Sequence, residues 1–180
     1  DETDDGEVKM VCLRCYEHKG TFWDEQNVRR TLETAHSTPS TTFVEAILDS
    51  FQSQTLTPSC LAFQQQTHTL AELLQEPENA SGISWVHECT EMLGQIGRAL
   101  RYLHRANLVH GNLSSTCIGR FEDGWKLTHI GQVIPVGSSI GGSFRRFAPP
   151  EHVKIYWDGA TSGTAIQTIV ARPSFDLFSF

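Results

Sequence analysis

The clearest pattern of apolar and polar positions along the chain covers residues 84–105. Apolar residues recur there at steps of three and four, which is the period of a helix with one buried face. The residues on that face are Val86, Cys89, Leu93, Ile96, Leu100 and Leu103. We therefore expect a long amphipathic helix, with Ser84 as its N-cap because a serine hydroxyl can accept a hydrogen bond from an amide of the first turn.

Three shorter apolar runs predict strands. In residues 9–17, "KMVCLRCYE", every second residue falls on one face, so Val11, Leu13 and Cys15 should lie together. Residues 43–51, "FVEAILDSF", and 59–63, "SCLAF", give two further strands. These runs favour a small sheet in the first third of the chain.

Two more helices are expected beside these strands. One starts near Thr21, where Asp24 or Glu25 completes a capping pattern, and the other opens with a capping box of Thr69 and Glu72. The apolar side of the first helix consists of Phe22, Val28 and Leu32.

The last third of the chain predicts a hairpin and a long loop. In "CIGRFEDGWKLTHIG", residues 117–131, apolar runs flank Asp123 and Gly124, and this dipeptide favours a tight turn because glycine accepts a positive φ. Residues 131–153 are rich in Gly and Ser and contain paired prolines, so they predict a long loop that enters a short helix.

Length and charge narrow the class of protein. A chain of 180 residues fits one domain with a core of its own. The net charge is -7, and the first seven residues supply five acidic side chains without a basic one. We expect this tail to be disordered. The remainder is nearly neutral, which argues against a nucleic-acid partner because phosphate binding needs a basic surface.

The order of the predicted elements resembles that of the protein kinase fold: strand, helix, two strands, short helix, long helix, polar loop, hairpin and long loop. Residues 11–14, "VCLR", resemble the third-strand motif V-A-I-K, with Arg14 at the lysine position. The later "FWDEQNVRRTL" resembles the helix that follows this strand, with Glu25 where the carboxylate partner of the lysine lies.

Four later motifs extend the resemblance. "LHRANLVHGNLSSTCIG" resembles the approach to the catalytic loop and its H-R-D-L-x-x-x-N, with matches at His110 and Leu113. "KLTHIG" resembles the D-F-G segment, with Gly131 matching, and "FAPPE" resembles A-P-E, with Glu151 matching. "SFDLFSF" resembles the start of the buried helix whose aspartate braces the catalytic loop, here Asp176.

The resemblance implies an α+β, two-lobed kinase-like fold that is truncated, with a small β-rich lobe and a mainly helical lobe. The resemblance begins near residue 8, and no Gly-rich loop precedes residue 11. It stops at Phe180, inside the helix of Asp176. The chain therefore resembles a fragment or an incomplete gene model. The implied parts are the acidic tail 1–7, the partial first lobe 8–66, the partial second lobe 67–180, the long helix 84–105, the catalytic-loop equivalent 108–118 and the activation-loop equivalent 129–151.

The chemistry of a kinase is replaced at three positions. Asn112 stands where a carboxylate should accept the proton of the substrate, and an amide has no basic site at neutral pH. Cys117 replaces an amide ligand of magnesium and His129 replaces the main magnesium carboxylate, and both suit softer metals. We therefore expect a catalytically inactive pseudokinase with no catalytic residue and no metal site, which serves as a protein-interaction or regulatory module.

Arg14 and Glu25 leave an alternative open. A structural ion pair between them is favoured over nucleotide contact, because the arginine fork is wider than the point charge of a lysine. If the pair and the hinge near residues 63–67 do hold a nucleotide, the chain is an atypical Ser/Thr kinase that binds ATP and transfers phosphate weakly. A third possibility is an unrelated α+β binding domain.

The expected ligands and location follow from these observations. No cofactor is expected, although ATP without magnesium is possible, and the partners should be proteins rather than nucleic acid or membrane. No apolar run is long enough to span a bilayer, and five unevenly spaced cysteines suggest reduced thiols and an intracellular, cytoplasmic location. Tyr156 and Trp157 could anchor a partner.

The remaining motifs have plainer explanations. The C-x-x-C of Cys12 and Cys15 fits small residues on a buried strand better than zinc, because no second cysteine pair follows. His104, His110 and His129 are expected to be ordinary hydrogen-bonded histidines rather than a metal cluster. The glycosylation patterns at Asn79 and Asn112, and the basic pair Arg145 and Arg146, are expected to have no specific role.

Overall fold

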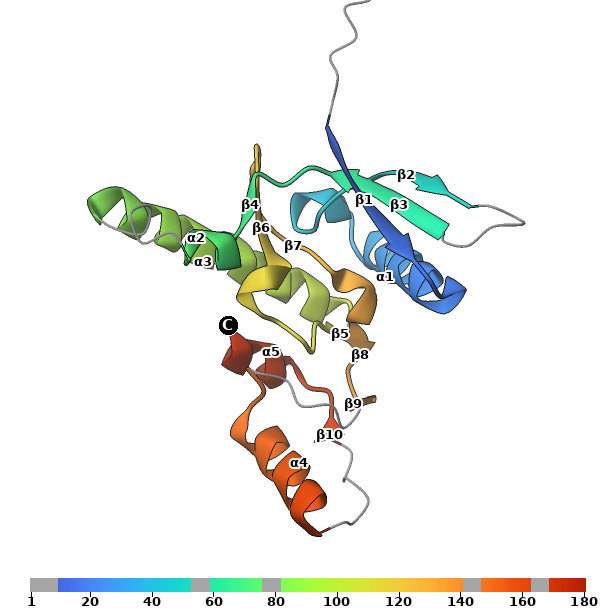
Figure 1. Cartoon of the computed structure of the whole chain (residues 1–180), viewed down its shortest axis with the longest axis vertical. Coiled ribbons are helices and arrows are strands. Elements are labelled where there is room, and N and C mark those ends of the chain that lie inside the picture. The colour runs from blue at the N-terminus through green and yellow to red at the C-terminus, as the bar shows by residue number, and fades with distance from the viewer. Residues whose placement is uncertain (1–9, 53–58, 76–81, 141–146, 163–168) are drawn as a thin grey trace, which may run out of the picture.

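A three-stranded antiparallel sheet stands at one end of the molecule (Figure 1). The computed structural model describes residues 10–52, 59–75, 82–140, 147–162 and 169–180. The sheet consists of β1 (Val11–Tyr16), β2 (Ile47–Phe51) and β3 (Ser59–Gln64), in the order β1-β3-β2. β1 pairs with β3 alone among the described strands, so it is an edge strand. The predicted strand over residues 43–51 is therefore too long, since only its second half joins the sheet.

One face of this sheet packs on α1 (Lys19–Ala35). Phe22, Leu61 and Phe63 form a buried cluster between them, which Tyr16 and Ile47 extend. The face of β1 that the alternation predicted exists, but Val11 and Leu13 on it are about half exposed. The period of two fixed which residues share a face, but it could not show which of the two faces is covered.

The start of α1 differs from the prediction. The helix begins at Lys19 with His18 as N-cap, and no side chain caps it. Thr21 lies inside the first turn, where its hydroxyl donates to the carbonyl of His18 at 2.9 Å. The capping pattern of Thr21 with Asp24 or Glu25 was therefore wrong. The capping box of Thr69 and Glu72 at α2 (Leu70–Leu73) is confirmed.

The long helix α3 (Gly82–Arg105) packs against the hairpin that follows it in the chain, and it passes behind this hairpin in Figure 1. It begins two residues before Ser84, so Ser84 is not its N-cap. The buried side of α3 packs on the hairpin and shares one hydrophobic core with η3 (Ile130–Gln132), and Ile96, Leu100 and Leu103 are almost fully covered. Val86 and Leu93, which belong to the same predicted face, are 65% and 48% exposed.

The hairpin of β6 (Ile118–Phe121) and β7 (Gly124–Leu127) confirms the turn signal, and β4 (His68–Thr69) pairs with β6, the central strand of this sheet. Phe121 pairs with Gly124, so the two loop residues are Glu122 and Asp123. Gly124 has φ 130° and lies so close to α3 that a Cβ there would meet Gln95 Oε1 at 2.8 Å. The positive φ requires glycine at that position, and the contact with Gln95 adds to the requirement.

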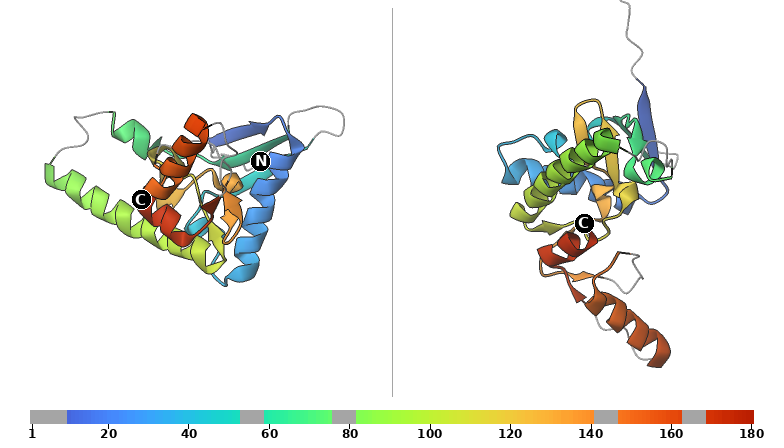
Figure 2. Two further views of the ribbon diagram at one scale, coloured as in Figure 1. Left: turned by 90° about the horizontal axis from the view of Figure 1, so that it is seen from below. Right: turned by 90° about the vertical axis from the view of Figure 1, so that its left-hand side faces the viewer.

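The segment 131–153, predicted as a long loop that enters a short helix, contains two short strands that each pair with a strand outside it. β5 (Leu108–Val109) pairs with β8 (Ile134–Pro135), and β9 (Ser139–Ile140) pairs with β10 (Ile169–Val170). η1 (Ser40–Thr42) and η2 (Ser115–Cys117) are single turns, α4 (Pro150–Ser162) begins at the second of the paired prolines, and α5 (Pro173–Ser179) lies near the end of the chain. Figure 2 shows α4 extending away from the rest of the molecule, and Trp157 on it is 65% exposed.

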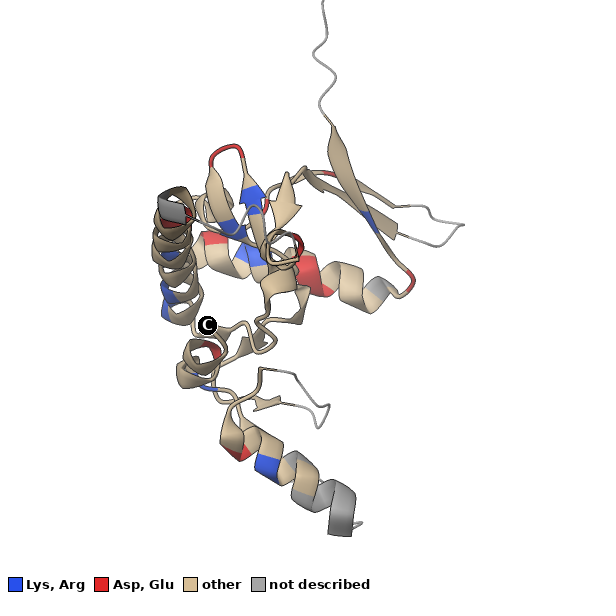
Figure 3. Ribbon diagram, turned by 60° about the vertical axis from the view of Figure 1, so that its left-hand side comes forward, with Lys and Arg blue, Asp and Glu red and all other residues tan. Residues whose placement is uncertain are grey.

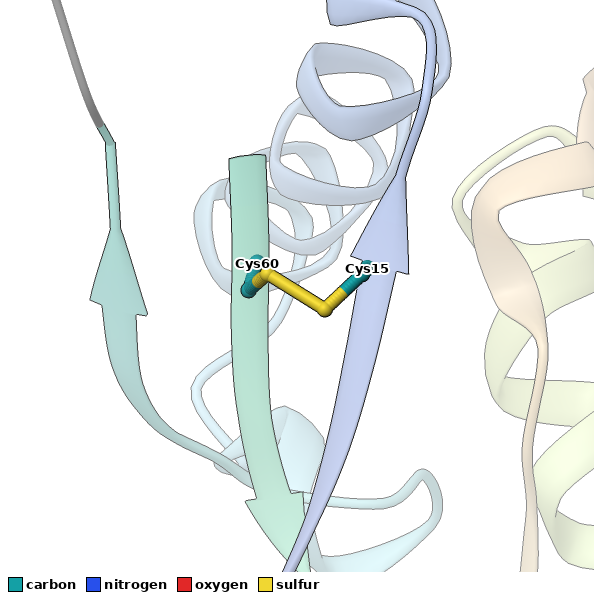
Figure 4. Close-up of a disulfide and its surroundings, with 2 residues drawn as sticks. All are labelled: Cys15 and Cys60. Atoms are coloured by element: carbon teal, nitrogen blue, oxygen red, sulfur yellow. A yellow bond between two sulfur atoms is a disulfide. The ribbon is translucent and has the colours of Figure 1, made fainter. Parts of the chain in front are cut away.

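A disulfide corrects the expectation that the cysteines are reduced thiols. Cys15 of β1 and Cys60 of β3 face each other across the ladder and are bonded (Figure 4). Cys12 is exposed rather than part of a buried strand, so the explanation given for the C-x-x-C was also wrong. Free thiols remain at Cys12, Cys89 and Cys117.

Several predictions lie outside the described residues: the acidic tail 1–7, Asn79, and the pair Arg145 and Arg146. Among the helices that the structure does describe, none is long and apolar enough to cross a bilayer.

Candidate functional site

Four charged side chains gather between the sheet and α1. Arg14 of β1 forms a two-pronged pair with Glu45, with Nη1 to Oε1 at 3.0 Å and Nη2 to Oε2 at 3.3 Å. Glu25 of α1 pairs with Arg29 one turn later at 3.0 Å, whereas Arg14 Nη1 is 4.0 Å from Glu25 Oε2. Arg29 also donates to the backbone carbonyl of Glu45. We call these four residues the ion cluster. The expected Arg14–Glu25 ion pair exists, but each residue has a closer partner.

Burial makes this cluster depend on its internal pairing. Glu25 and Glu45 are 2% and 3% exposed, and the ring of Phe63 lies under both guanidinium groups. Burial raises the pKa of Glu25, although the positive charge of Arg29 opposes the shift. Burial works to lower the pKa of Arg14, but the negative charges near it, Glu45 foremost, together outweigh burial, so that the pKa of Arg14 is raised. Removing one member would leave a charge without compensation in a poorly solvated place.

His129 connects the ion cluster to the segment that follows β7. Its backbone has φ 58°, in the left-handed region, and its N–H donates to Glu45 Oε1 at 3.0 Å. Its ring Nδ1 pairs with the hydroxyl of Thr128 at 2.9 Å. Partial burial of the ring lowers the pKa of His129, and the charge of Arg14 lowers it further. Glu45 therefore joins β1 to the residues just before η3.

Gly131 lies against the same cluster. A Cβ added there would be 2.5 Å from Glu25 Oε2, which is too close for any side chain unless Glu25 moves. Glycine at this position thus permits the close approach of η3 to α1.

The segment 108–118 is held by a buried carboxylate. Asp176 of α5 is fully buried and accepts hydrogen bonds from His110 N at 2.8 Å and Gly111 N at 2.7 Å. His104 Nε2 of α3 lies 2.9 Å from the same carboxylate. Gly111 has φ 70°, a backbone conformation that glycine accepts freely. One carboxylate thereby fastens α3, α5 and the loop after β5 to one another.

The remaining positions of this segment bond within the chain. Asn112 Nδ2 donates to Gln132 Oε1 at 3.2 Å, and the buried thiol of Cys117 donates to Asn112 O at 3.6 Å. Leu113 is buried in the main core, and Glu151 is exposed in the first turn of α4. The structure thus brings Asn112 and Cys117 together, and it places His129 at the opposite end of η3 from Gln132.

These donor atoms do not fit a magnesium ion. Magnesium prefers oxygen ligands at octahedral positions, whereas Cys117 and His129 offer a thiol and an imidazole, and all three side chains, including the amide of Asn112, already have partners. Among the residues that the structure describes, no group of three His, Cys, Asp or Glu side chains could hold a metal ion. His104, His110 and His129 have separate partners: Asp176, the carbonyl of Thr128, and Thr128 Oγ1.

The sequence patterns did not single out Arg29, Glu45 and Gln132. The Glu25–Arg29 spacing of four residues on a helix was an available signal, because such residues are neighbours on one face. Glu45 had no comparable signal: it lies inside the apolar run "FVEAIL", where a charged residue reads as the polar side of a strand.

Comparison with known proteins tests the fold. No family model matches the chain, and no curated protein matches its sequence. A crystal structure of a rhoptry kinase from Toxoplasma gondii is similar to it, with a TM-score of 0.64 and 19% identity over 91% of this chain. The chain has a protein kinase-like fold. The kinase-like chain spans 49% of the length of that structure. An identity of 19% supports the fold and leaves activity to be argued from the residues.

Proposed function

We propose that this kinase-like chain is a pseudokinase, a domain that transfers no phosphate and acts as a protein-interaction or regulatory module. The observation that carries the proposal is the two-pronged pair of Arg14 with Glu45. The guanidinium at the lysine position of the family is already neutralised by a buried carboxylate, and that carboxylate also accepts the amide of His129. Glu45 therefore competes with any phosphate group for the positive charge of Arg14.

The reacting positions add to this argument. Asn112 cannot accept a proton at neutral pH, and its side-chain amide bonds Gln132. Phosphoryl transfer depends on charges that hold the phosphates and on a base that orients the nucleophile. A chain without a carboxylate at residues 112 and 129 lacks both kinds of group at these positions.

Nucleotide binding tests the proposal directly. A ligand that binds only the folded state must raise the Tm of the chain. Because we expect no nucleotide to bind, ATP or ADP at millimolar concentration, with or without magnesium, should leave the Tm of the full chain unchanged. The matched variant Asn112→Asp with His129→Asp restores both carboxylates, and aspartate tolerates the left-handed backbone of residue 129. Its Tm should also show no nucleotide response, since Arg14 stays paired.

A saturable rise in Tm with ATP, together with phosphate transfer to a generic protein substrate, would contradict the proposal. That result would support the atypical kinase instead, with Arg14 and Glu25 as nucleotide contacts.

The partners of the module are proposed to be proteins. An intracellular location remains a prediction, and the Cys15–Cys60 disulfide argues against a reducing compartment such as the cytosol. The proposals on partners and location apply to this chain, which spans about half the length of the similar kinase structure.

A further inference from the structure

Three arginines form a row near the C-terminal end of α3. Arg98, Arg101 and Arg105 are separated by three and four residues, so they lie on one side of the helix. All three are exposed. At 1.5 Å per residue the row is about 10 Å long. We call these three residues the arginine row, and Figure 3 shows the blue bands of basic residues on this helix.

The arginine row has no acidic partner within the described part of the chain. The arginine and lysine side chains that form ion pairs among the described residues are those of Arg14, Arg29, Arg120 and Lys126, and no side chain of the row takes part in one. The acidic residues of α3, Glu88 and Glu91, belong to its first half. From residue 92 to residue 121 the sequence contains no Asp or Glu, so the positive charge of this surface is not offset by its own segment.

The helix dipole explains only part of this arrangement. Cations are favoured in the last turn of a helix, where the carbonyl ends carry partial negative charge. Arg105 lies in that turn, but Arg98 lies two turns earlier, beyond the reach of the effect. The dipole therefore accounts for Arg105 but not for Arg98.

The arginine row borders a pocket whose other lining residues are held in place by contacts within the protein. The pocket has a volume of about 200 Å³ and is lined by the row together with His36, Thr38, Phe43 and Tyr102. His36 stacks on Tyr102 with ring centroids 4.0 Å apart, and its Nε2 lies 2.9 Å from the carbonyl of Tyr102. The Tyr102 hydroxyl donates to Thr38 O at 2.9 Å. These contacts hold His36 and Tyr102 in place in the absence of a ligand, and such preorganisation lowers the entropy cost of binding.

We infer that the arginine row and its pocket bind an acidic peptide segment of a partner protein. Charge complementarity favours this occupant, because planar guanidinium groups form paired hydrogen bonds with carboxylates. The length of the row favours a linear ligand over a single phosphate: about 10 Å corresponds to three or four residues of extended peptide. Glu33, which bonds Ser40 near Tyr102, is the acidic group beside the pocket and would disfavour a ligand that enters from that side.

The inference goes beyond the proposed function and does not depend on it. The pocket is built from α3 and the residues after α1, and it contains none of the positions discussed for phosphate transfer. Peptide binding and nucleotide binding can therefore succeed or fail separately.

A fluorescein-labelled peptide of six alternating Asp and Glu residues, titrated into the full chain, tests the inference by fluorescence polarisation. We expect saturable binding that weakens with added salt, and no binding of the matched Asn/Gln peptide. The variant Arg98→Gln, Arg101→Gln, Arg105→Gln should weaken binding by about tenfold or more, since three exposed ion pairs are lost. A control variant removes the same positive charge elsewhere: Arg30→Gln, Lys154→Gln, Arg172→Gln, all exposed. It should bind like the unchanged chain.

Several results would overturn the inference. Equal losses in the two triple variants would show a response to net charge alone, and equal competition by inorganic phosphate would show a simple anion site. The titration is repeated on a chain whose five acidic residues among 1–7 are replaced by Asn or Gln, which stops them from competing. Absence of binding there as well would also refute it. If the row variant does not unfold cooperatively, the single charge reversal Arg101→Glu takes its place and should show the same tenfold loss.

Discussion

The carboxylate of Glu45 is shared by groups from separate parts of the chain. It receives the guanidinium of Arg14 from β1 and the backbone amide of His129 from the segment after β7, and it lies within 4.0 Å of Arg29 from α1. A buried carboxylate needs such compensation, because an unpaired charge in this place costs several kcal/mol. Glu45 thus fixes the position of Arg14 and His129, which together with Asn112 are the residues on which the proposed inactivity rests.

The imidazole of His129 gives stability a dependence on pH at the scale of one residue. Partial burial and the charge of Arg14 lower the pKa of His129 in the folded chain, while the unfolded chain keeps the ordinary value of about 6.5. The unfolded state then binds more protons, so the free energy of unfolding should fall as the pH drops below about 6.5. In His129→Asn the loss between pH 7 and pH 5 should be smaller, because asparagine accepts the left-handed backbone without titrating.

Urea unfolding at several pH values measures this difference. His87→Asn is the matched control, because His87 is exposed and makes only a 3.7 Å contact with Glu91. An identical pH dependence for His129→Asn and the unchanged chain would refute the prediction.

At the scale of elements, α5 is joined to the rest of the chain by Asp176. We expect Asp176→Asn to lower the free energy of unfolding by about 3–5 kcal/mol, because the buried carboxylate accepts from His110 N, Gly111 N and His104. An amide has a single acceptor oxygen and would set its NH₂ group against one of these donors. Denaturant unfolding measures the loss, with the exposed Ser174→Asn in the same helix as control. A loss below 1 kcal/mol would show that α5 does not depend on this carboxylate.

Elements with a strong local signal were predictable from the sequence, and their ends and surroundings were less so. The 84–105 periodicity, the Thr69–Glu72 capping box and the Asp123–Gly124 turn each reflect contacts between near neighbours, and all three elements formed. Ser84 and Thr21 failed as N-caps because each helix begins two residues before them, and the exact end of a helix is poorly marked by a local pattern. The exposure of the outer face of β1 depends on whether another element covers it, and a local sequence pattern does not contain this information.

At the scale of the whole molecule, the order of motifs predicted the kinase-like fold, since order and spacing are properties of the sequence. The contacts within the site were less predictable. Arg14 and Glu45 are 31 residues apart, and His129 and Glu45 are 84 apart. Neither pairing has a local signature, so the sequence suggested an Arg14–Glu25 pair and only the fold showed the preference for Glu45. The same reasoning applies to the pairing of Cys15 with Cys60, which the irregular cysteine spacing did not indicate.

The disulfide holds the edge strand that carries Arg14. It closes a loop of 45 residues, and loss of such a bond typically costs about 2–4 kcal/mol. We expect dithiothreitol, or Cys15→Ser with Cys60→Ser, to lower the Tm and to speed hydrogen exchange in β1 while the hairpin of β6 and β7 stays protected, because β1 pairs with β3 alone among the described strands. Cys12→Ser, on the same strand but outside the bond, should change neither. If mass spectrometry finds Cys15 and Cys60 alkylated by iodoacetamide without reductant, the bond does not form in solution, and Arg14 is held by its ion pairs and the β1–β3 ladder.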